Sequence, residues 1–141
     1  MVILSQQIKN QLCFSAESAY PEECCGFLLG TERDGTRTVH EAIEVHNAQD
    51  VNRDRRFLMT SDQYRRVERL AIEKHLEVVG IYHSHPDHPS RPSGFDRERA
   101  WPDWVYIILS IEIGKYKDGR AWILKDSDSP FEEEKIDLIS E

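Results

Sequence analysis

The sequence predicts a mixed α/β domain over residues 1–141, with a curved, largely antiparallel sheet and helices packed against it. A length of 141 residues and 39% hydrophobic content match one ordinary domain with a single core. Apolar segments of helical and strand period follow one another in the order αββ(β)αβαββ. Hairpin-joined strands dominate the end of the chain, which favours antiparallel pairing over a doubly wound parallel sheet.

The first half of the chain contains one predicted helix followed by strands. Ser5 is placed to cap the helix, apolar residues recur along one face, and Pro21 ends it. The short apolar run CCGFLLG and an imperfectly alternating segment follow, joined across the polar turn TERDG. The predicted elements are a helix from Ser5 towards Tyr20, strands at 24–30 and 36–47, an exposed loop at 48–56 and a short strand at 57–59.

The second half begins with the most regular helical pattern in the chain. Ser61 is the predicted cap, and Tyr64, Val67 and Leu70 lie on an apolar stripe opposite a charged face. A β-rich segment then runs into a proline-containing loop. The remaining predicted elements are a strand at 77–85, a short helix from Ser93, and strands at 104–111 and 119–126.

Composition excludes several classes of function. The formal charge of −8 gives no basic stripe for nucleic acid, and no apolar run approaches the roughly 20 residues that a membrane span needs. The start of the chain lacks the features of a signal peptide, and three cysteines, two of them adjacent, make a poor disulfide framework. We therefore expect a cytoplasmic protein with reduced thiols and no nucleic-acid or membrane partner.

The segment HSHPDHPSRPSGFD, residues 83–96, concentrates potential metal ligands. Side chains alternate along a strand, so His83 and His85 point to the same side. A catalytic site of the zinc type usually takes three protein ligands and leaves a fourth position open. Asp96, in the first turn of the helix that begins at Ser93, is placed to return over the proline-stiffened loop as the third ligand.

Two other interpretations of these histidines must be weighed. His-x-His alone also occurs in solvated loops. The string His83-x-His85-x-Asp87-His88 formally matches the loop of the metallo-β-lactamase fold. That fold needs further histidines downstream, whereas none follows His88, and its two-lobed sandwich does not fit into 141 residues. We take this second match to be accidental.

The full string resembles the JAMM motif of the MPN+ zinc metalloprotease family in its short bacterial single-domain form. His83, Ser84, His85, Pro86, Ser93 and Asp96 fill every motif position. YPEECCGFLLG, upstream, is similar to the bacterial form of the family's first strand, and the likeness covers roughly residues 5–126. The resemblance implies the cytidine-deaminase-like MPN fold and one zinc ion held by His83, His85 and Asp96.

The resemblance also assigns two catalytic residues. Its glutamate lies three positions before the strand glycine, which is Glu23 before Gly26, whereas Glu22 is displaced by one and should face away. Glu23 would act as general base. Without the resemblance, both carboxylates would be taken as solvated. Ser93 would donate to the oxyanion of the tetrahedral intermediate, and it is also placed to cap the helix in a box with Asp96.

Other residues of reactive type have simpler interpretations. His88 lies outside the motif and is expected in the loop at the mouth of the site, although an extra metal contact stays open. Cys24 and Cys25 are flanked by apolar residues and are expected to be small buried hydrophobes rather than nucleophiles. Trp101, Trp104 and Trp122 are expected to line the core or a groove.

The resemblance implies a zinc-dependent peptidase or isopeptidase. The expected substrate is a ubiquitin-like sulfur carrier of the ThiS or MoaD type, cleaved directly after its C-terminal Gly-Gly. Two alternatives stay open: a hydrolase of small peptides or amides without a protein partner, and a non-catalytic MPN scaffold. The complete ligand set argues against the scaffold.

Overall fold

The computed structural model describes residues 1–140 and contains one eight-stranded mixed sheet with three helices. None of the helices in this part of the chain has the length and apolar character needed to cross a membrane. The elements are β1 (Val2–Ser5), α1 (Gln6–Ala19), β2 (Cys25–Arg33), β3 (Thr36–Val45), α2 (Ser61–Glu73), β4 (Glu77–Pro86), α3 (Gly94–Arg99), β5 (Val105–Glu112), β6 (Lys115–Ile123), β7 (Glu132–Glu134) and β8 (Ile136–Ile139).

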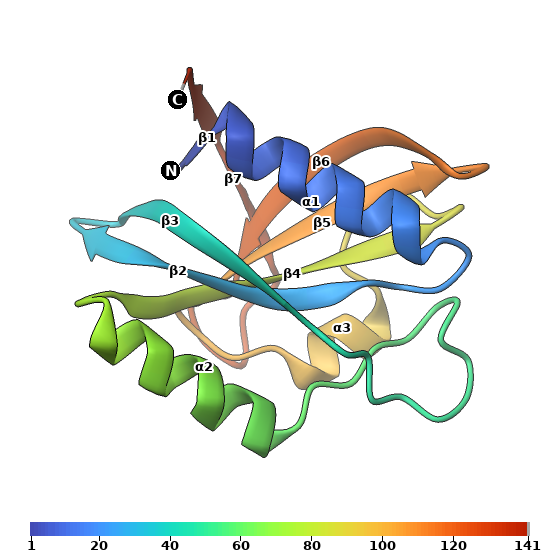
Figure 1. Ribbon diagram of the computed structural model, residues 1–141, viewed down its shortest axis with the longest axis horizontal. Coiled ribbons are helices and arrows are strands. Elements are labelled where there is room, and N and C mark those ends of the chain that lie inside the picture. The colour runs from blue at the N-terminus through green and yellow to red at the C-terminus, as the bar shows by residue number, and fades with distance from the viewer. Residues whose placement is uncertain (141) are drawn as a thin grey trace.

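The strands lie in the order β7-β6-β5-β4-β2-β3-β1-β8 and form a curved sheet (Figure 1). Four neighbouring pairs are antiparallel: β2 with β3, β2 with β4, β5 with β6, and β6 with β7. The three parallel pairs are β1 with β3, β1 with β8, and β4 with β5. The predicted mixed, mostly antiparallel sheet is confirmed.

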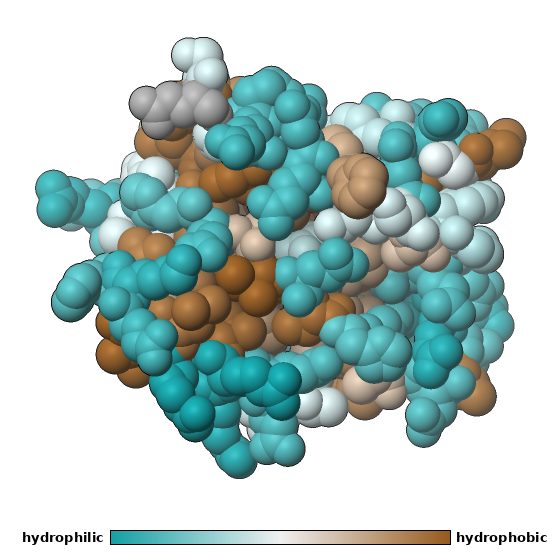
Figure 2. Space-filling model, viewed as in Figure 1, coloured by the Kyte–Doolittle hydropathy of each residue, from teal (hydrophilic) through white to brown (hydrophobic). Residues whose placement is uncertain are grey.

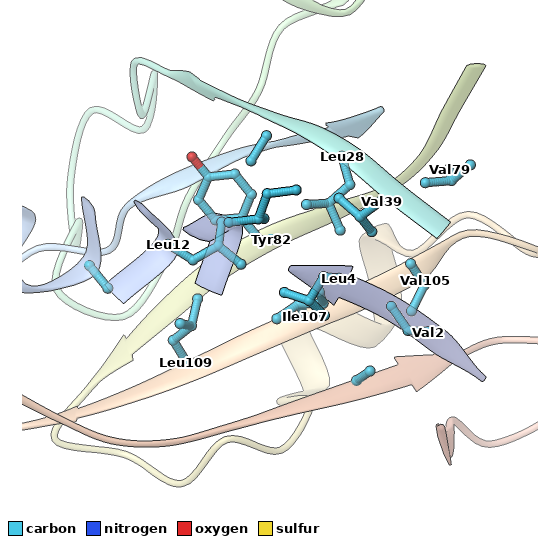
Figure 3. Close-up of a cluster of buried hydrophobic side chains, with 14 of the residues drawn as sticks. Val2, Leu4, Leu12, Leu28, Val39, Val79, Tyr82, Val105, Ile107 and Leu109 are labelled. Atoms are coloured by element: carbon cyan, nitrogen blue, oxygen red, sulfur yellow. The ribbon is translucent and has the colours of Figure 1, made fainter. Parts of the chain in front are cut away.

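The helices cover opposite faces of this sheet, with α1 on one side and α2 and α3 on the other (Figure 1). On the α1 side, fully buried residues such as Leu12, Leu28 and Tyr82 form the larger apolar cluster (Figure 3). A smaller cluster around Phe27, Val67 and Ile81 lies under α2. Hydrophobic side chains gather over the strands between α1 and α2, bordered by hydrophilic residues (Figure 2).

The direction of the side chains on β4 is set by an irregularity near its start. The register against β2 shifts between Leu28 and Leu29, so that Gly80 and then Val78 are the facing residues. Beyond this bulge the alternation is regular: Tyr82 belongs to the cluster under α1, and Ile81 to the cluster under α2. His83 and His85 therefore follow Ile81 to the side of α2 and α3.

Several predicted elements need correction. Residues 57–59 form no strand, because the backbone of Leu58 bonds to the Asn47 side chain and to Ala48, which leaves no regular ladder. The cap of α2 is Thr60, one residue before the predicted one, with Gln63 completing a capping box. Strands β1, β7 and β8 were not predicted, since they are only three or four residues long, and β1 and β8 also depend on partners distant in sequence.

Candidate metal centre and active site

Two elements bring together three potential ligands. His83 and His85 come from the end of β4 and Asp96 from the first turn of α3, and their ligand atoms all lie within 4.8 Å of one another. All three residues are buried, with exposed fractions of 0%, 6% and 8%. The predicted convergence of the aspartate on the two histidines is therefore present.

A capping box places Asp96 at this point. The Asp96 amide donates to the Ser93 hydroxyl, and the Ser93 amide donates to Asp96 Oδ2. The donor–acceptor distance is 3.0 Å in both hydrogen bonds. This reciprocal pair anchors the start of α3 and holds the carboxylate at its first turn. The same oxygen, Oδ2, lies 3.3 Å from His83 Nε2 and 3.0 Å from His85 Nε2.

The hydrogen bonding of His85 indicates a site for a cation. His85 Nδ1 lies 2.7 Å from the Pro89 carbonyl, which can only accept, so this nitrogen carries the proton in the neutral ring. Nε2 then presents a lone pair to the Asp96 carboxylate. Two electron-rich atoms at 3.0 Å are stabilised by a cation between them, and the Nδ1 bond orients the ring as in metal sites.

His83 completes the donor set. It is fully buried, and neither ring nitrogen has a hydrogen-bond partner among the described residues. Burial lowers the pKa of His83, which favours the neutral ring that binds metals. Phe57 stacks on the ring with centroids 4.4 Å apart and helps to orient it.

The burial and the ionisation state of Asp96 are also consistent with a metal ligand. Burial alone would raise the pKa of this carboxyl, but the charge and hydrogen bonds that His83 and His85 supply when a ring is protonated lower it well below its usual range. An ionised carboxylate with two neutral imidazoles is a donor set typical of zinc. The three residues therefore fit a divalent metal of this type.

Glu23 lies two residues before β2 and is buried. Its side chain is only 4% exposed, and Oε1 has no hydrogen-bond partner in the described chain. Burial, followed by the nearby Asp96, raises the pKa of Glu23 to about 9. Glu22 is exposed, as predicted from its displacement by one position. A buried carboxyl without a partner is costly and marks a position used for something other than stability.

Ser84 connects the segment of Glu23 to β4, the strand that carries His83 and His85. Its hydroxyl accepts from the Cys24 amide at 2.8 Å, and its amide donates to the Cys24 carbonyl. Because Ser84 points away from the two histidines, it connects the opposite face of β4 to the residue after Glu23. The serine of the His-Ser-His motif is thus a positioning residue.

Asn47 was missed by sequence reasoning. Its side-chain amide donates to the carbonyls of Glu23 and Arg56, at 3.2 and 3.1 Å. Its side-chain oxygen accepts from the amides of Gln49 and Leu58, each at 3.0 Å. This one buried side chain uses its full hydrogen-bonding capacity to join Glu23 to the loop that carries Phe57. A lone polar residue after a strand offers no sequence signal for that role.

Ser93 is exposed beside the ligands. In the capping box its oxygen accepts a hydrogen bond, so the hydroxyl proton is not used by the helix. A serine hydroxyl offers one donor and two acceptor positions. Capping and donation to a substrate oxygen are therefore compatible.

A pocket of about 440 Å³ opens beside His83 and Asp96. Its walls come from β2, β4 and β5, the loop before α2, and the segment after α3. The remaining lining residues are mostly apolar or aromatic and include Phe27, Phe57, Tyr64, Trp101, Trp104 and Tyr106. Two of the candidate ligands, His83 and Asp96, therefore border a space suited to an apolar group.

The other residues of reactive type lie as expected. His88 is exposed in the loop and is not one of the clustered ligands. Cys24 and Cys25 are free and buried, and burial raises the pKa of Cys24 to about 12. Trp101 and Trp104 line the pocket, and Trp122 packs against the cluster under α2.

Comparison with known proteins places the chain in a family. Residues 5–125 match the family of prokaryotic homologs of the JAB domain. A desampylase of Pyrococcus furiosus is 37% identical over 106 residues, which are 74% of this chain and 68% of the relative. A desampylase of Haloferax volcanii is 43% identical over 93 residues, covering 64% and 63% respectively. The matched region thus spans about two thirds of the length of these relatives.

Solved structures agree with this placement. A protein of Desulfitobacterium hafniense has a TM-score of 0.88 at 26% identity, covering 100% of this chain and 94% of that one. A JAB1/MPN domain protein of Archaeoglobus fulgidus has a TM-score of 0.59 at 19% identity, covering 99% and 98%, and so shows the fold alone. The chain belongs to the prokaryotic JAB-domain family and has the JAB/MPN fold.

Proposed function

We propose that this protein is a zinc-dependent peptidase or isopeptidase that hydrolyses the amide bond after the C-terminal Gly-Gly of a ubiquitin-like sulfur carrier of the ThiS or MoaD type. The observation that carries the proposal is the buried cluster of His83, His85 and Asp96, next to the unpaired carboxyl of Glu23. Groups buried at such cost are typical of a catalytic centre.

The relatives support the class of reaction. The two desampylases and the shared JAB/MPN fold indicate a hydrolase of the metallopeptidase class. The name of both relatives, desampylase, denotes the removal of a protein modifier. A ubiquitin-like substrate is the corresponding expectation here, and the sulfur carrier is our more specific choice.

The donor set supports zinc. Two imidazoles and one carboxylate form a three-ligand set, and a metal would satisfy one of the two unpaired, buried ring nitrogens of His83. When bound, zinc supplies Lewis acidity, which acidifies water and polarises a carbonyl.

The chain's own residues supply proton transfer and charge stabilisation. Glu23 accepts the proton of the attacking water and transfers it to the leaving nitrogen. The raised pKa of about 9 describes the carboxyl without a metal, and a dication nearby would lower that pKa because it stabilises the carboxylate. Ser93 directs its unused hydroxyl proton towards the developing oxyanion while its oxygen continues to cap α3.

Mass spectrometry of a carrier protein before and after incubation tests the proposal. A carrier extended beyond Gly-Gly should lose the extension, and both a zinc chelator and Glu23→Gln should abolish the loss. An unchanged mass for every cognate carrier, together with turnover of unrelated short peptides, would favour a small-amide hydrolase. A protein that binds no metal and cleaves neither substrate would be a scaffold.

A further inference from the structure

The pocket beside the metal ligands combines an apolar interior with a cationic rim. His83 and Asp96 lie at one end, and aromatic side chains such as Tyr64 and Trp104 line the wall. Arg99 also lines this pocket. Glycine has no side chain, so a Gly-Gly tail leaves such a space unfilled. Another part of the substrate must therefore account for it.

Two arginines stack on the Phe95 ring next to this pocket: Arg99, which lines it, and Arg56, which reaches the same ring from the segment before Phe57. The guanidinium carbons of Arg56 and Arg99 lie 4.7 and 4.4 Å from the centroid of the Phe95 ring. Phe95 stands between Ser93 and Asp96 in the sequence, and Arg56 directly precedes Phe57, which stacks on His83. The arginines therefore belong to the segments that form the metal site.

Neither arginine has an acidic partner. Within residues 1–140, neither forms an ion pair, although the chain has 26 acidic and only 18 basic residues. Both side chains are exposed, so their N–H groups are free to bind an anion. A guanidinium fork matches a carboxylate in geometry and charge. The rim is thus complementary to a carboxylate held next to the apolar interior.

We propose that this pocket binds the group released by the reaction, an amino acid with an apolar side chain whose α-carboxylate is bound by Arg56 and Arg99. The proposal rests on the function proposed above and makes the enzyme a trimming peptidase for carriers with one residue beyond Gly-Gly. One water is consumed: its hydroxyl joins the glycine carbonyl carbon, the C–N bond breaks, and a proton goes to the leaving nitrogen. The products are a carrier ending in a glycine carboxylate and a free amino acid.

The main alternative leaving group is a lysine side chain in an isopeptide bond. Such a linkage carries no carboxylate near the scissile nitrogen and leaves both guanidinium groups without a partner. The straight aliphatic chain of a lysine would also fill only a small part of the aromatic pocket. Charge and shape together favour the free amino acid.

Two matched substrates test the proposal. A carrier extended by one phenylalanine after Gly-Gly is prepared with a C-terminal carboxylate or with a carboxamide. The zinc-loaded protein should cleave the carboxylate form with a kcat/KM about tenfold higher, because the carboxamide cannot form charge-assisted hydrogen bonds to the two guanidinium groups. The Arg56→Gln/Arg99→Gln protein should cleave both forms at equal rates with unchanged zinc content. Arg65→Gln, at an exposed arginine on α2 paired with Asp62, should keep the preference.

Equal rates of the wild-type protein on both forms, or a preference that survives the double substitution, would overturn the proposal. Equilibrium binding of both forms to the Glu23→Gln protein separates it from the proposed function. If neither form is cleaved but the carboxylate binds about tenfold tighter through the two arginines, the pocket assignment stands and hydrolysis of this substrate does not. Equal binding of both forms would reject the pocket assignment.

Discussion

The two faces of β4 differ in what their buried side chains achieve. On the α1 face, Tyr82 lies in a large apolar cluster together with Leu28 (Figure 3). On the face towards α2 and α3, His83 and His85 are also buried, but they lie next to the Asp96 carboxylate. The ring nitrogens of His83 have no hydrogen-bond partner among the described residues. Adjacent residues of one strand thus serve packing and chemistry separately.

The difference has an energetic meaning. Apolar burial contributes about 25 cal/mol per Å², so the α1 face contributes mainly to the free energy of unfolding. A buried polar group without a partner costs about 1–3 kcal/mol. This cost arises at the Tyr82 hydroxyl on the α1 face and at both ring nitrogens of His83 on the face towards α2 and α3. Only at His83 would a metal ion recover part of it, by binding one of the unpaired nitrogens. Substitutions on the face towards α2 and α3 should therefore lower turnover or zinc content, whereas substitutions on the α1 face should lower the free energy of unfolding.

Removing a metal ligand should have the largest effect. His85→Ala should reduce zinc from one ion per chain to nearly none and abolish turnover, because two ligands rarely retain the ion. Elemental analysis of the purified protein measures this. His88→Ala, in the same loop but outside the cluster, should keep its zinc. Unchanged metal content in His85→Ala would refute the assignment.

Glu23→Gln should separate chemistry from metal binding. The amide keeps the shape of the side chain but cannot accept the proton, so kcat should fall about 10²–10⁴-fold while zinc content stays the same. Steady-state kinetics alongside metal analysis measures both quantities. Glu22→Gln, at the exposed neighbour, is the matched control. A defect that follows Glu22 instead would show that the wrong carboxylate was chosen.

Ser93 can be tested for capping and catalysis separately. Glycine is a tolerable N-cap, so Ser93→Gly should weaken α3 by only a few tenths of a kcal/mol. The loss of the hydroxyl donor should still lower kcat about hundredfold. Ser93→Thr keeps both functions and should keep most of the activity. If Ser93→Gly is fully active, the hydroxyl serves only the helix.

Leu28→Ala tests the packing face. Leu28 is fully buried under α1, and its truncation should lower the free energy of unfolding by about 2–5 kcal/mol. Turnover and zinc content, measured well below the unfolding temperature, should not change. Chemical denaturation gives the stability. A large fall in kcat of the folded protein would mean that the two faces are coupled.

Local patterns were enough to predict the main elements and the ligands. The spacing of His83 and His85 placed them on one side of a strand, and Ser93 with Asp96 three residues later marked the start of α3. Both relations depend only on the period of a strand and the first turn of a helix. They are therefore readable from sequence.

The tertiary structure decided how these parts meet. Asn47 bonds to the carbonyl of Glu23, 24 positions away in the sequence, and to the carbonyl of Arg56, 9 positions away. Arg56 in turn contacts the Phe95 ring from a different segment. Strands β1 and β8 pair although they lie at opposite ends of the described chain. No sequence period encodes such contacts, because they depend on the packing of whole elements. The sequence by itself therefore predicted the candidate ligands and the fold class, whereas only the folded chain determined the partners of the Glu23 backbone, the pocket and the arginines next to it.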